Sequence, residues 1–338
     1  MVDSEVFLMT VWLWVGFLVL ILGLLALDLG VMHRRPHVIR TREALMWTVF
    51  WIFLGLLFNV AVYFIYEHHW LGIGTAIREP LSGKDAALKY FTGYVVEKSL
   101  SLDNIFVFAL IFNYFGVPPI YQHRVLFWGI LGALILRGIM IALGVALIQR
   151  FSWIIYVFGA LLILTAVKML MTREDKLEPD RNPLVRLARR FYPVTSDFEG
   201  QKFFTRVDGA RAITPLFLVL LVVESSDVMF AVDSIPAIFA ITTDPFIVFT
   251  SNVFAILGLR ALYFALASIL DRFRYLKVSL MLVLVYVGVK MILSGHYHIP
   301  TGISLAVIAG VLTTGIVSSL LFAPHPAGSV RRPAGQPE

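Results

Sequence analysis

Five acidic side chains lie inside long apolar stretches of this sequence, where charged residues are rare. Glu97 and Asp103 fall in VVEKSLSLDNIF, and Glu224, Asp227 and Asp233 fall in VVESSDVMFAVDSIP. A charge near the middle of a membrane-crossing helix costs about 2.5 to 3.5 kcal/mol on insertion scales, so such residues face the interior of a helix bundle and mark function. We therefore expect these carboxylates to hold protons or to bind a cation.

The polar side chains near these acids supply oxygen ligands. Asn104 lies seven residues beyond Glu97 and so shares its helix face, while Ser234 and Asn252 are further hydroxyl and amide ligands. Met229 could add a soft ligand that favours Mn²⁺, although methionine more often packs as an apolar side chain. None of the eight histidines falls near the middle of an apolar run. Oxygen ligands favour a hard divalent ion of the Mg²⁺, Ca²⁺ or Mn²⁺ type over Zn²⁺ or Cu⁺.

Two arginines and one further acid also lie within apolar runs. Arg137 and Arg260 fall near the middle of their runs and can neutralise two of the five acids through bidentate pairs. Equally, they can serve only to fix how the helices pack. Asp28 lies near a basic loop, and the sequence leaves open whether it pairs with an arginine on that side or binds metal.

If the second acidic stretch forms a straight helix, its three acids cannot all point to the same side. At about 100° per residue, Glu224 and Asp227 lie about 60° apart, whereas Asp233 lies about 180° from Glu224. Pro236 cannot donate a hydrogen bond to the Val232 carbonyl. We therefore predict an unwound turn around residues 233 to 235, which would turn Asp233 inward and free backbone carbonyls for a cation.

The elements that must position these residues are membrane-spanning helices. The chain of 338 residues is 59% hydrophobic and 15% charged, against roughly 25% charged residues in an average soluble domain. Apolar runs of about 20 residues are long enough to cross a bilayer. The fold class is therefore all-α and polytopic, with nine runs at residues 6–32, 42–66, 86–115, 122–149, 152–171, 214–241, 246–270, 276–294 and 300–323.

The basic residues outside these runs predict the orientation. Nine spans place the basic segments at 33–42, 173–211, 271–277 and 331–332 on one side, and the positive-inside rule makes that side cytoplasmic. The N-terminus is then outside, the C-terminus is inside, and the protein is a multi-pass inner-membrane protein. The net charge of +6 needs no nucleic-acid partner. With no cysteine, a thiolate metal site and a thiol nucleophile are excluded.

Residues 95–170 and 222–292 repeat one order of motifs. Each unit contains three spans, so the second copy enters the membrane from the opposite side, and the two are predicted to form inverted repeats. Transporters built this way place their site near the bilayer midplane, between the copies. The matched lysines lie at opposite ends of their spans, where both can reach water. The matched positions are Glu97 with Glu224, Asp103 with Asp233 across a short gap, Arg137 with Arg260, and Lys168 with Lys290.

The predicted organisation has six parts. One of them, the cytoplasmic loop, is predicted to contain a short basic amphipathic helix over residues 184–191, which lies either on the inner leaflet or in a solvated tether. The parts are 1–85 with two spans and an outer loop, 86–172 and 214–295 with the two repeats, 173–213 as a cytoplasmic loop, 296–323 with the last span, and 324–338 as a disordered tail.

The two acidic stretches resemble the paired signatures of the TerC family of integral membrane proteins, and the nine-span layout with a long central loop resembles its Alx-like branch. The resemblance covers nearly the whole chain except the tail. It implies kinship with LysE-type exporters, a link to tellurium resistance, and export of Mn²⁺. On that resemblance the metal-handling residues are Glu97, Asp103, Asn104, Glu224, Asp227 and Asp233.

The resulting hypothesis is a transporter that exports a divalent cation, Mn²⁺ first, through a midplane carboxylate site. Mn²⁺ is its substrate, and no prosthetic group is expected. The sequence leaves open coupling to H⁺, coupling to Na⁺, or no coupling. An intramembrane aspartyl protease is disfavoured because its YD and GxGD motifs are missing here, so we expect no enzyme. A non-transporting membrane scaffold linked to tellurite or envelope stress is the alternative, and the sequence identifies no protein partner.

Overall fold

Long helices account for nearly all of the regular structure. The computed structural model describes residues 2–30, 40–70, 81–171, 182–207, 209–267, 275–297 and 299–321. The tail at 324–338, the arginines at 331–332 and most of the basic segments at 33–42 and 271–277 lie outside these ranges. The elements are α1 (Val2–Gly30), α2 (Thr41–Glu67), α3 (Gly83–Tyr114), α4 (Pro119–Arg150), α5 (Ile154–Met171), α6 (Pro183–Phe191), β1 (Phe204–Val207), β2 (Ala210–Ile213), α7 (Pro215–Phe239), α8 (Pro245–Leu257), α9 (Leu259–Leu266), α10 (Leu276–Leu293) and α11 (Thr301–Leu321).

Eight stretches among the described residues are long and apolar enough to cross a membrane, with α8 and α9 counted as one. The prediction of an all-α polytopic membrane protein is therefore confirmed. The one predicted span that is not among these eight is α3, which is 32 residues long, or about 48 Å at 1.5 Å per residue. It falls outside the apolar class because it carries Lys84, Asp85, Lys89, Glu97, Lys98 and Asp103. Its position among the other helices allows it to carry these charges.

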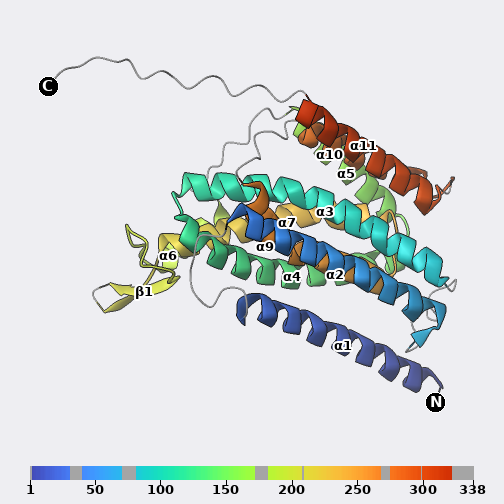
Figure 1. Cartoon of the computed structure of the whole chain (residues 1–338), viewed down its shortest axis with the longest axis horizontal. Coiled ribbons are helices and arrows are strands. Elements are labelled where there is room, and N and C mark those ends of the chain that lie inside the picture. Colours follow the sequence, from blue (N-terminus) through green and yellow to red (C-terminus); the bar gives the residue numbers. More distant parts are fainter. Residues whose placement is uncertain are drawn as a thin grey trace.

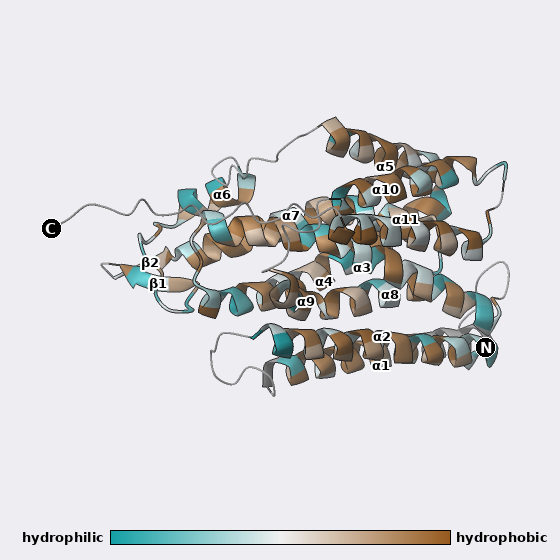
Figure 2. Ribbon diagram, turned by 45° about the horizontal axis from the view of Figure 1, so that its top comes forward, coloured by the Kyte–Doolittle hydropathy of each residue, from teal (hydrophilic) through white to brown (hydrophobic). Residues whose placement is uncertain are grey.

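The helices form three layers, which Figures 1 and 2 show from two directions. Helices α5, α10 and α11 lie on one side, with α10 packed on both α5 and α11. Helices α1 and α2 lie on the other side, and the middle layer holds α3, α4, α7, α8 and α9. Phe17 of α1 packs edge-on against Phe246 and Phe249 of α8. The acidic helices α3 and α7 thus both belong to the middle layer of the bundle.

Proline and short polar side chains start the middle helices. Pro119, Pro215 and Pro245 each occupy the first helical position, where the missing amide costs nothing. Asp244 caps α8 by accepting from the amides of Phe246 and Ile247. The Tyr66 hydroxyl also donates to Asp244 at 2.7 Å, which ties the end of α2 to the start of α8.

Helix α7 is continuous through Pro236, so the predicted unwound turn at 233 to 235 is wrong. The Pro236 carbonyl still accepts from the Ala240 amide, and the packed neighbours of a membrane helix compensate for the one amide that proline lacks. The interruption falls instead at Gly258, between α8 and α9. A side chain at that position would meet Trp51 at 2.9 Å, so glycine is required there.

The segment after α5 contains the predicted short helix and an unpredicted hairpin. Helix α6 has the expected amphipathic pattern. Strands β1 and β2 pair antiparallel, with Val207 opposite Ala210. The DG dipeptide at 208–209 between them is a strong hairpin signal. Lys290 also differs from expectation, because it lies buried under α11 and donates to Ser304 at 2.8 Å rather than reaching water.

The helix pairings follow the order expected from two inverted units. Helix α3 packs on α8, α4 packs on α7, and α5 packs on α10. Helices α3 and α7 run in opposite directions, since Gly93 lies near Ile238 while the later residue Glu97 shares a partner with the earlier residue Asp227. The inverted repeat itself and the six-part division of the chain stay predictions.

Candidate functional site

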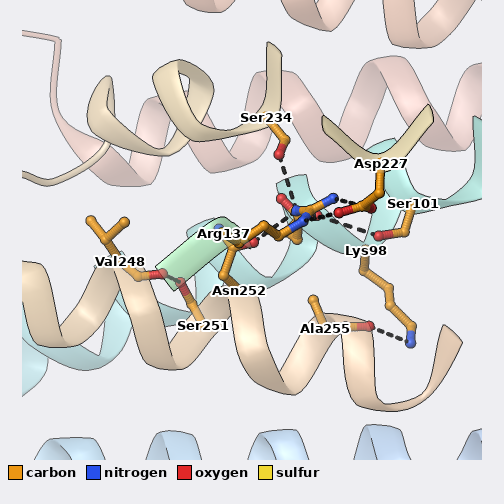
Figure 3. Close-up of polar contacts among 10 residues, drawn as sticks. Lys98, Ser101, Arg137, Asp227, Ser234, Val248, Ser251, Asn252 and Ala255 are labelled. Atoms are coloured by element: carbon orange, nitrogen blue, oxygen red, sulfur yellow. Dashed lines mark hydrogen bonds and ion pairs between the residues drawn. The ribbon is translucent and has the colours of Figure 1, made fainter. Parts of the chain in front are cut away.

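Arg137 lies at the centre of a buried polar cluster formed by four helices. Its guanidinium contacts Glu97 of α3, Asp227 and Ser234 of α7, and Asn252 of α8. Figure 3 shows Arg137 together with the labelled side chains of Asp227, Ser234 and Asn252. All five residues are at most 3% exposed. We call Glu97, Asp227, Ser234 and Asn252 the oxygen cage.

The contacts of Arg137 are with oxygen atoms. Nη1 donates to Asn252 Oδ1 at 2.8 Å, to Ser234 Oγ at 3.1 Å and to a Glu97 carboxylate oxygen. Nε and Nη2 lie 3.4 and 3.3 Å from the two carboxylate oxygens of Asp227, which is a long bidentate pair. Ser101, one turn beyond Glu97, lies 3.5 Å from the same Glu97 oxygen. Arg137 therefore pairs with two of the five acids, which is one of the two roles that the sequence leaves open for it.

The cage has hydrogen-bonding capacity that the protein does not fill. Glu97 Oε2 and Asn252 Nδ2 are buried and have no hydrogen-bond partner. Buried polar atoms without partners are uncommon because they lose their hydration without replacement. Within the described ranges no three His, Asp or Glu side chains converge as a metal site, so a cation at this place would rely on two carboxylates plus amide and hydroxyl oxygens.

Two of the predicted acids lie on either side of the cage and outside it. Asp103 is six residues beyond Glu97, and Asp233 is six residues beyond Asp227, which is about 9 Å along each helix. Because α3 and α7 run in opposite directions, Asp103 lies toward the first residues of α7 and Asp233 toward its last residues. Both are half-buried. Thr165 of α5, which the sequence analysis did not identify, donates to Asp233 at 2.8 Å.

Glu224 lies beside the cage on the same side as Asp103. It precedes Asp227 by one helical turn and packs against α4 at Gly132, where its carboxylate occupies the space that a Cβ would take. Its Oε2 atom is buried and has no hydrogen-bond partner. Of the five predicted acids, Glu97 and Asp227 are thus brought together, Glu224 lies next to them, and Asp103 and Asp233 flank them.

Four other predicted residues lie in different surroundings. Arg260 of α9 donates to Asp28 of α1 at 2.5 Å, and both are buried. Arg260 thus pairs with an acid outside the predicted five, and Asp28 has an arginine partner. Asn104 is buried on the face of α3 that carries Glu97. Met229 is 65% exposed on the outside of α7 and does not point into the cage.

Lys98 is a charged residue of this region that the sequence analysis passed over. Its ammonium group donates to the Ala255 carbonyl at 3.1 Å (Figure 3), three residues before the helix interruption at Gly258. A lysine in the middle of a 32-residue helix inside the bundle was itself the available signal, since intramembrane cations are rare. Lys98 therefore takes the carbonyl that the interruption leaves open.

The contacts of Arg137 offer a second way to match the two acidic stretches. Glu97 and Asp227 share Arg137, and each is followed six residues later by an aspartate. Matching these two residues requires no gap, whereas matching Glu97 with Glu224 requires one. Glu224 then has no acidic counterpart in the first stretch, where Tyr94 takes its place. The second stretch therefore carries one extra acid.

Comparison with known proteins identifies the family. Residues 82–325 match the integral membrane protein TerC family. An uncharacterized membrane protein of Myxococcus xanthus is 51% identical over 313 residues, which cover 93% of each chain. A "putative membrane-bound redox modulator Alx" of Escherichia coli K12 is 48% identical over 304 residues, covering 89% of this chain and 91% of that one.

No solved structure matches this chain. The family match spans most of the sequence and includes the helices that form the oxygen cage. The names of both of these relatives describe them as membrane proteins. The chain belongs to the integral membrane protein TerC family.

Proposed function

We propose that this protein exports a divalent metal cation, with Mn²⁺ as the preferred ion, from the cytoplasm. The observation that carries the proposal is the buried oxygen cage, in which two carboxylates, an amide and a hydroxyl surround a positive charge inside a membrane bundle. Hard divalent ions prefer such ligands. Glu97 Oε2, a buried carboxylate oxygen that Arg137 does not use, favours a site that also binds a metal cation.

The flanking acids supply a route to and from the cage. Glu224 and Asp103 lie on the side of the first residues of α7, and Asp233 lies on the other side. The long segment before α7 contains basic residues of α6 such as Arg186 and Arg190, so the positive-inside rule makes that side cytoplasmic. Two acids then face the cytoplasm and one faces outward, an arrangement suited to capturing a cation from inside. This orientation and placement in the inner membrane are parts of the proposal.

Protons compete with metal for carboxylates, so transport coupled to H⁺ inflow is our working mechanism. The ion would enter past Glu224 or Asp103, occupy the cage, and leave past Asp233 as the two three-helix units rock against each other. The protein then needs no prosthetic group, and Mn²⁺ is its substrate. An enzymatic role is not part of the proposal.

The test is Mn²⁺ uptake into inside-out vesicles that contain the full chain, with and without an imposed proton gradient. We expect uptake by the wild type, stimulated by a gradient that drives protons out of the vesicles, and none by Glu97→Gln or Asp227→Asn. Asp28→Asn is the matched control, because it removes a buried, arginine-paired carboxylate outside the cage. Equal uptake by the wild type and Asp227→Asn would overturn the proposal.

A non-transporting role is the second candidate, and one observation favours it. Arg137 already pairs with both cage carboxylates, so the cluster can serve only to hold four helices together. The name of the Escherichia coli relative suggests redox modulation. These 338 residues contain no cysteine, so a thiol–disulfide function would have to reside in a partner. Vesicles that show no metal flux with either wild type or variants would favour this role.

A further inference from the structure

The guanidinium of Arg137 occupies the place that a cation would take in the oxygen cage. It contacts one oxygen each of Glu97, Ser234 and Asn252 and both carboxylate oxygens of Asp227. The other cation near these oxygens, Lys98 beside Glu97 on α3, donates to the Ala255 carbonyl. A divalent ion can therefore use this set of ligands only if the guanidinium leaves.

A buried arginine that leaves two carboxylates needs another acceptor. An isolated charge inside the bundle is strongly unfavourable, and removing one partner of a buried pair is costly for that reason. The bundle offers such an acceptor at Glu224, whose Oε2 atom is buried without a hydrogen-bond partner. Glu224 precedes Asp227 by three residues on α7, a rise of about 4.5 Å, and lies against Arg137's own helix at Gly132.

We propose that Arg137 is a tethered counter-ion of the transport site and that Glu224 is its second docking position. This inference rests on the proposed function and concerns the same site. The structure shows Arg137 paired with Glu97 and Asp227, and we assign this pairing to the state without a bound ion. When a divalent cation binds the cage, the guanidinium moves one turn along α7 and pairs with Glu224. When the ion leaves, the guanidinium returns and restores the neutralised empty cage.

The charges support this exchange. The two cage carboxylates carry two negative charges, and a divalent ion neutralises both, which leaves Arg137 and Glu224 as a matched pair one turn away. Without Glu224, ion binding would strand a buried arginine. The extra acid of the second stretch, which has no counterpart at Tyr94 in the first, thereby acquires a role that does not require it to touch the metal.

The test is a double-mutant cycle on Mn²⁺ binding by the purified full-length protein in detergent. Calorimetry with MnCl₂ as the probe measures the Mn²⁺ affinity of each variant. The four proteins are the wild type, Glu224→Gln, Arg137→Gln and the double variant. We expect Glu224→Gln to weaken Mn²⁺ binding roughly tenfold, a coupling typical of residues in contact. Arg137→Gln should bind Mn²⁺ more tightly than the wild type, because the competing cation is gone. Adding Glu224→Gln to Arg137→Gln should then change nothing further.

Two outcomes overturn the inference while leaving the proposed function intact. If Glu224→Gln weakens binding equally in both backgrounds, Glu224 is a ligand or entry acid rather than a docking position for Arg137. If a folded Arg137→Gln protein binds Mn²⁺ less tightly than the wild type, Arg137 organises the site rather than competing for it. A wild type that binds no Mn²⁺ overturns the proposed function, and the inference with it.

A second cycle tests whether the position of Glu224 matters if Arg137→Gln does not fold. Gly132→Ala places a methyl group where the Glu224 carboxylate lies, so it should push Glu224 away and weaken Mn²⁺ binding as Glu224→Gln does. Because both changes act through the same docking position, combining them should weaken binding no further than either alone. Unchanged affinity in Gly132→Ala, or additive losses in the pair, would count against the exchange.

Discussion

The two buried arginines of this protein lie in different kinds of surroundings. Arg260 joins α9 to α1 through Asp28, whereas Arg137 is enclosed by α3, α7 and α8 and contacts two carboxylates, an amide and a hydroxyl. The sequence matches the two arginines as equivalent positions of a repeat. The structure gives them unlike partners.

The difference separates structural from functional burial of charge. The Arg260–Asp28 pair ties α1 to the bundle, which α1 otherwise meets largely through aromatic side chains such as Phe17. The Arg137 cluster lies among helices that already pack closely on one another, and it contains a carboxylate oxygen, Glu97 Oε2, that Arg137 does not contact. A cluster with more ligand atoms than its own cation uses is the better place for a transported ion.

The strongest way to break this comparison is to remove the charges of each group completely. Asp28→Leu combined with Arg260→Met should preserve folding and Mn²⁺ uptake, because a buried pair can be replaced by apolar side chains of similar volume. The cage variant with Glu97→Gln, Arg137→Met and Asp227→Asn should fold but show only the uptake of protein-free vesicles. Vesicle uptake normalised to folded protein measures both. Loss of uptake in the Asp28 and Arg260 variant alone would reverse the assignment.

Single substitutions should rank the other way when stability is measured. Asp28→Asn leaves a buried arginine facing a neutral partner, so we expect the free energy of unfolding to fall by about 3 to 5 kcal/mol. Glu97→Gln should cost less, because Arg137 retains Asp227. Unfolding of the purified protein by SDS in mixed micelles compares the two. A larger loss in Glu97→Gln would show that the cage, and not the α1 contact, holds the bundle together.

The sequence predicts the bundle well because hydropathy and length control membrane helices. Each predicted span has a corresponding helix, and the acids that belong inside are where charge in an apolar run places them. Even α3, which is too charged for an apolar span, is found inside. The start of α3 is determined by neighbouring residues in the sequence, because Ser82 caps the helix by accepting from the Asp85 amide.

The details of the site depend on packing that the sequence does not encode locally. Pro236 suggested a break in α7, but its neighbours accommodate it, and the interruption occurs at Gly258 where Trp51 approaches. Asp233 was expected to turn inward, and it meets Thr165 of α5 instead. The choice of acid that pairs with Arg137 depends on how far α4 and α7 are shifted along their axes relative to each other. The pattern of a single helix does not specify that shift.

Substitution of a flanking acid, Asp103 or Asp233, should affect transport less than substitution of a cage carboxylate. The two flanking acids should also differ in the side of the membrane on which the effect is seen. We expect Asp103→Asn to raise the Mn²⁺ concentration for half-maximal transport about tenfold from the cytoplasmic side, by loss of one charged contact. Asp233→Asn should do the same for exchange from the outer side. Maximal rates should stay near wild type, because the cage is intact. Half-maximal concentrations measured in oppositely oriented vesicles test this, and side-independent effects would contradict it.

The smallest expected effect concerns α6, which lies against α7 beside Glu224 through the contact of Ser225 with Asn182. The exposed side chains of Leu184, Leu187 and Phe191 recur at helical spacing, so α6 is predicted to rest on the inner leaflet. The chain has no cysteine, so a spin label at Leu187→Cys or Arg186→Cys reports a single position.

In vesicles containing anionic lipid, the label at residue 187 should be more accessible to dissolved oxygen and less accessible to a water-soluble nickel complex than the label at 186. Transport should be unchanged in both variants, because neither residue lies in the cage. Equal accessibility of the two labels would favour the solvated tether.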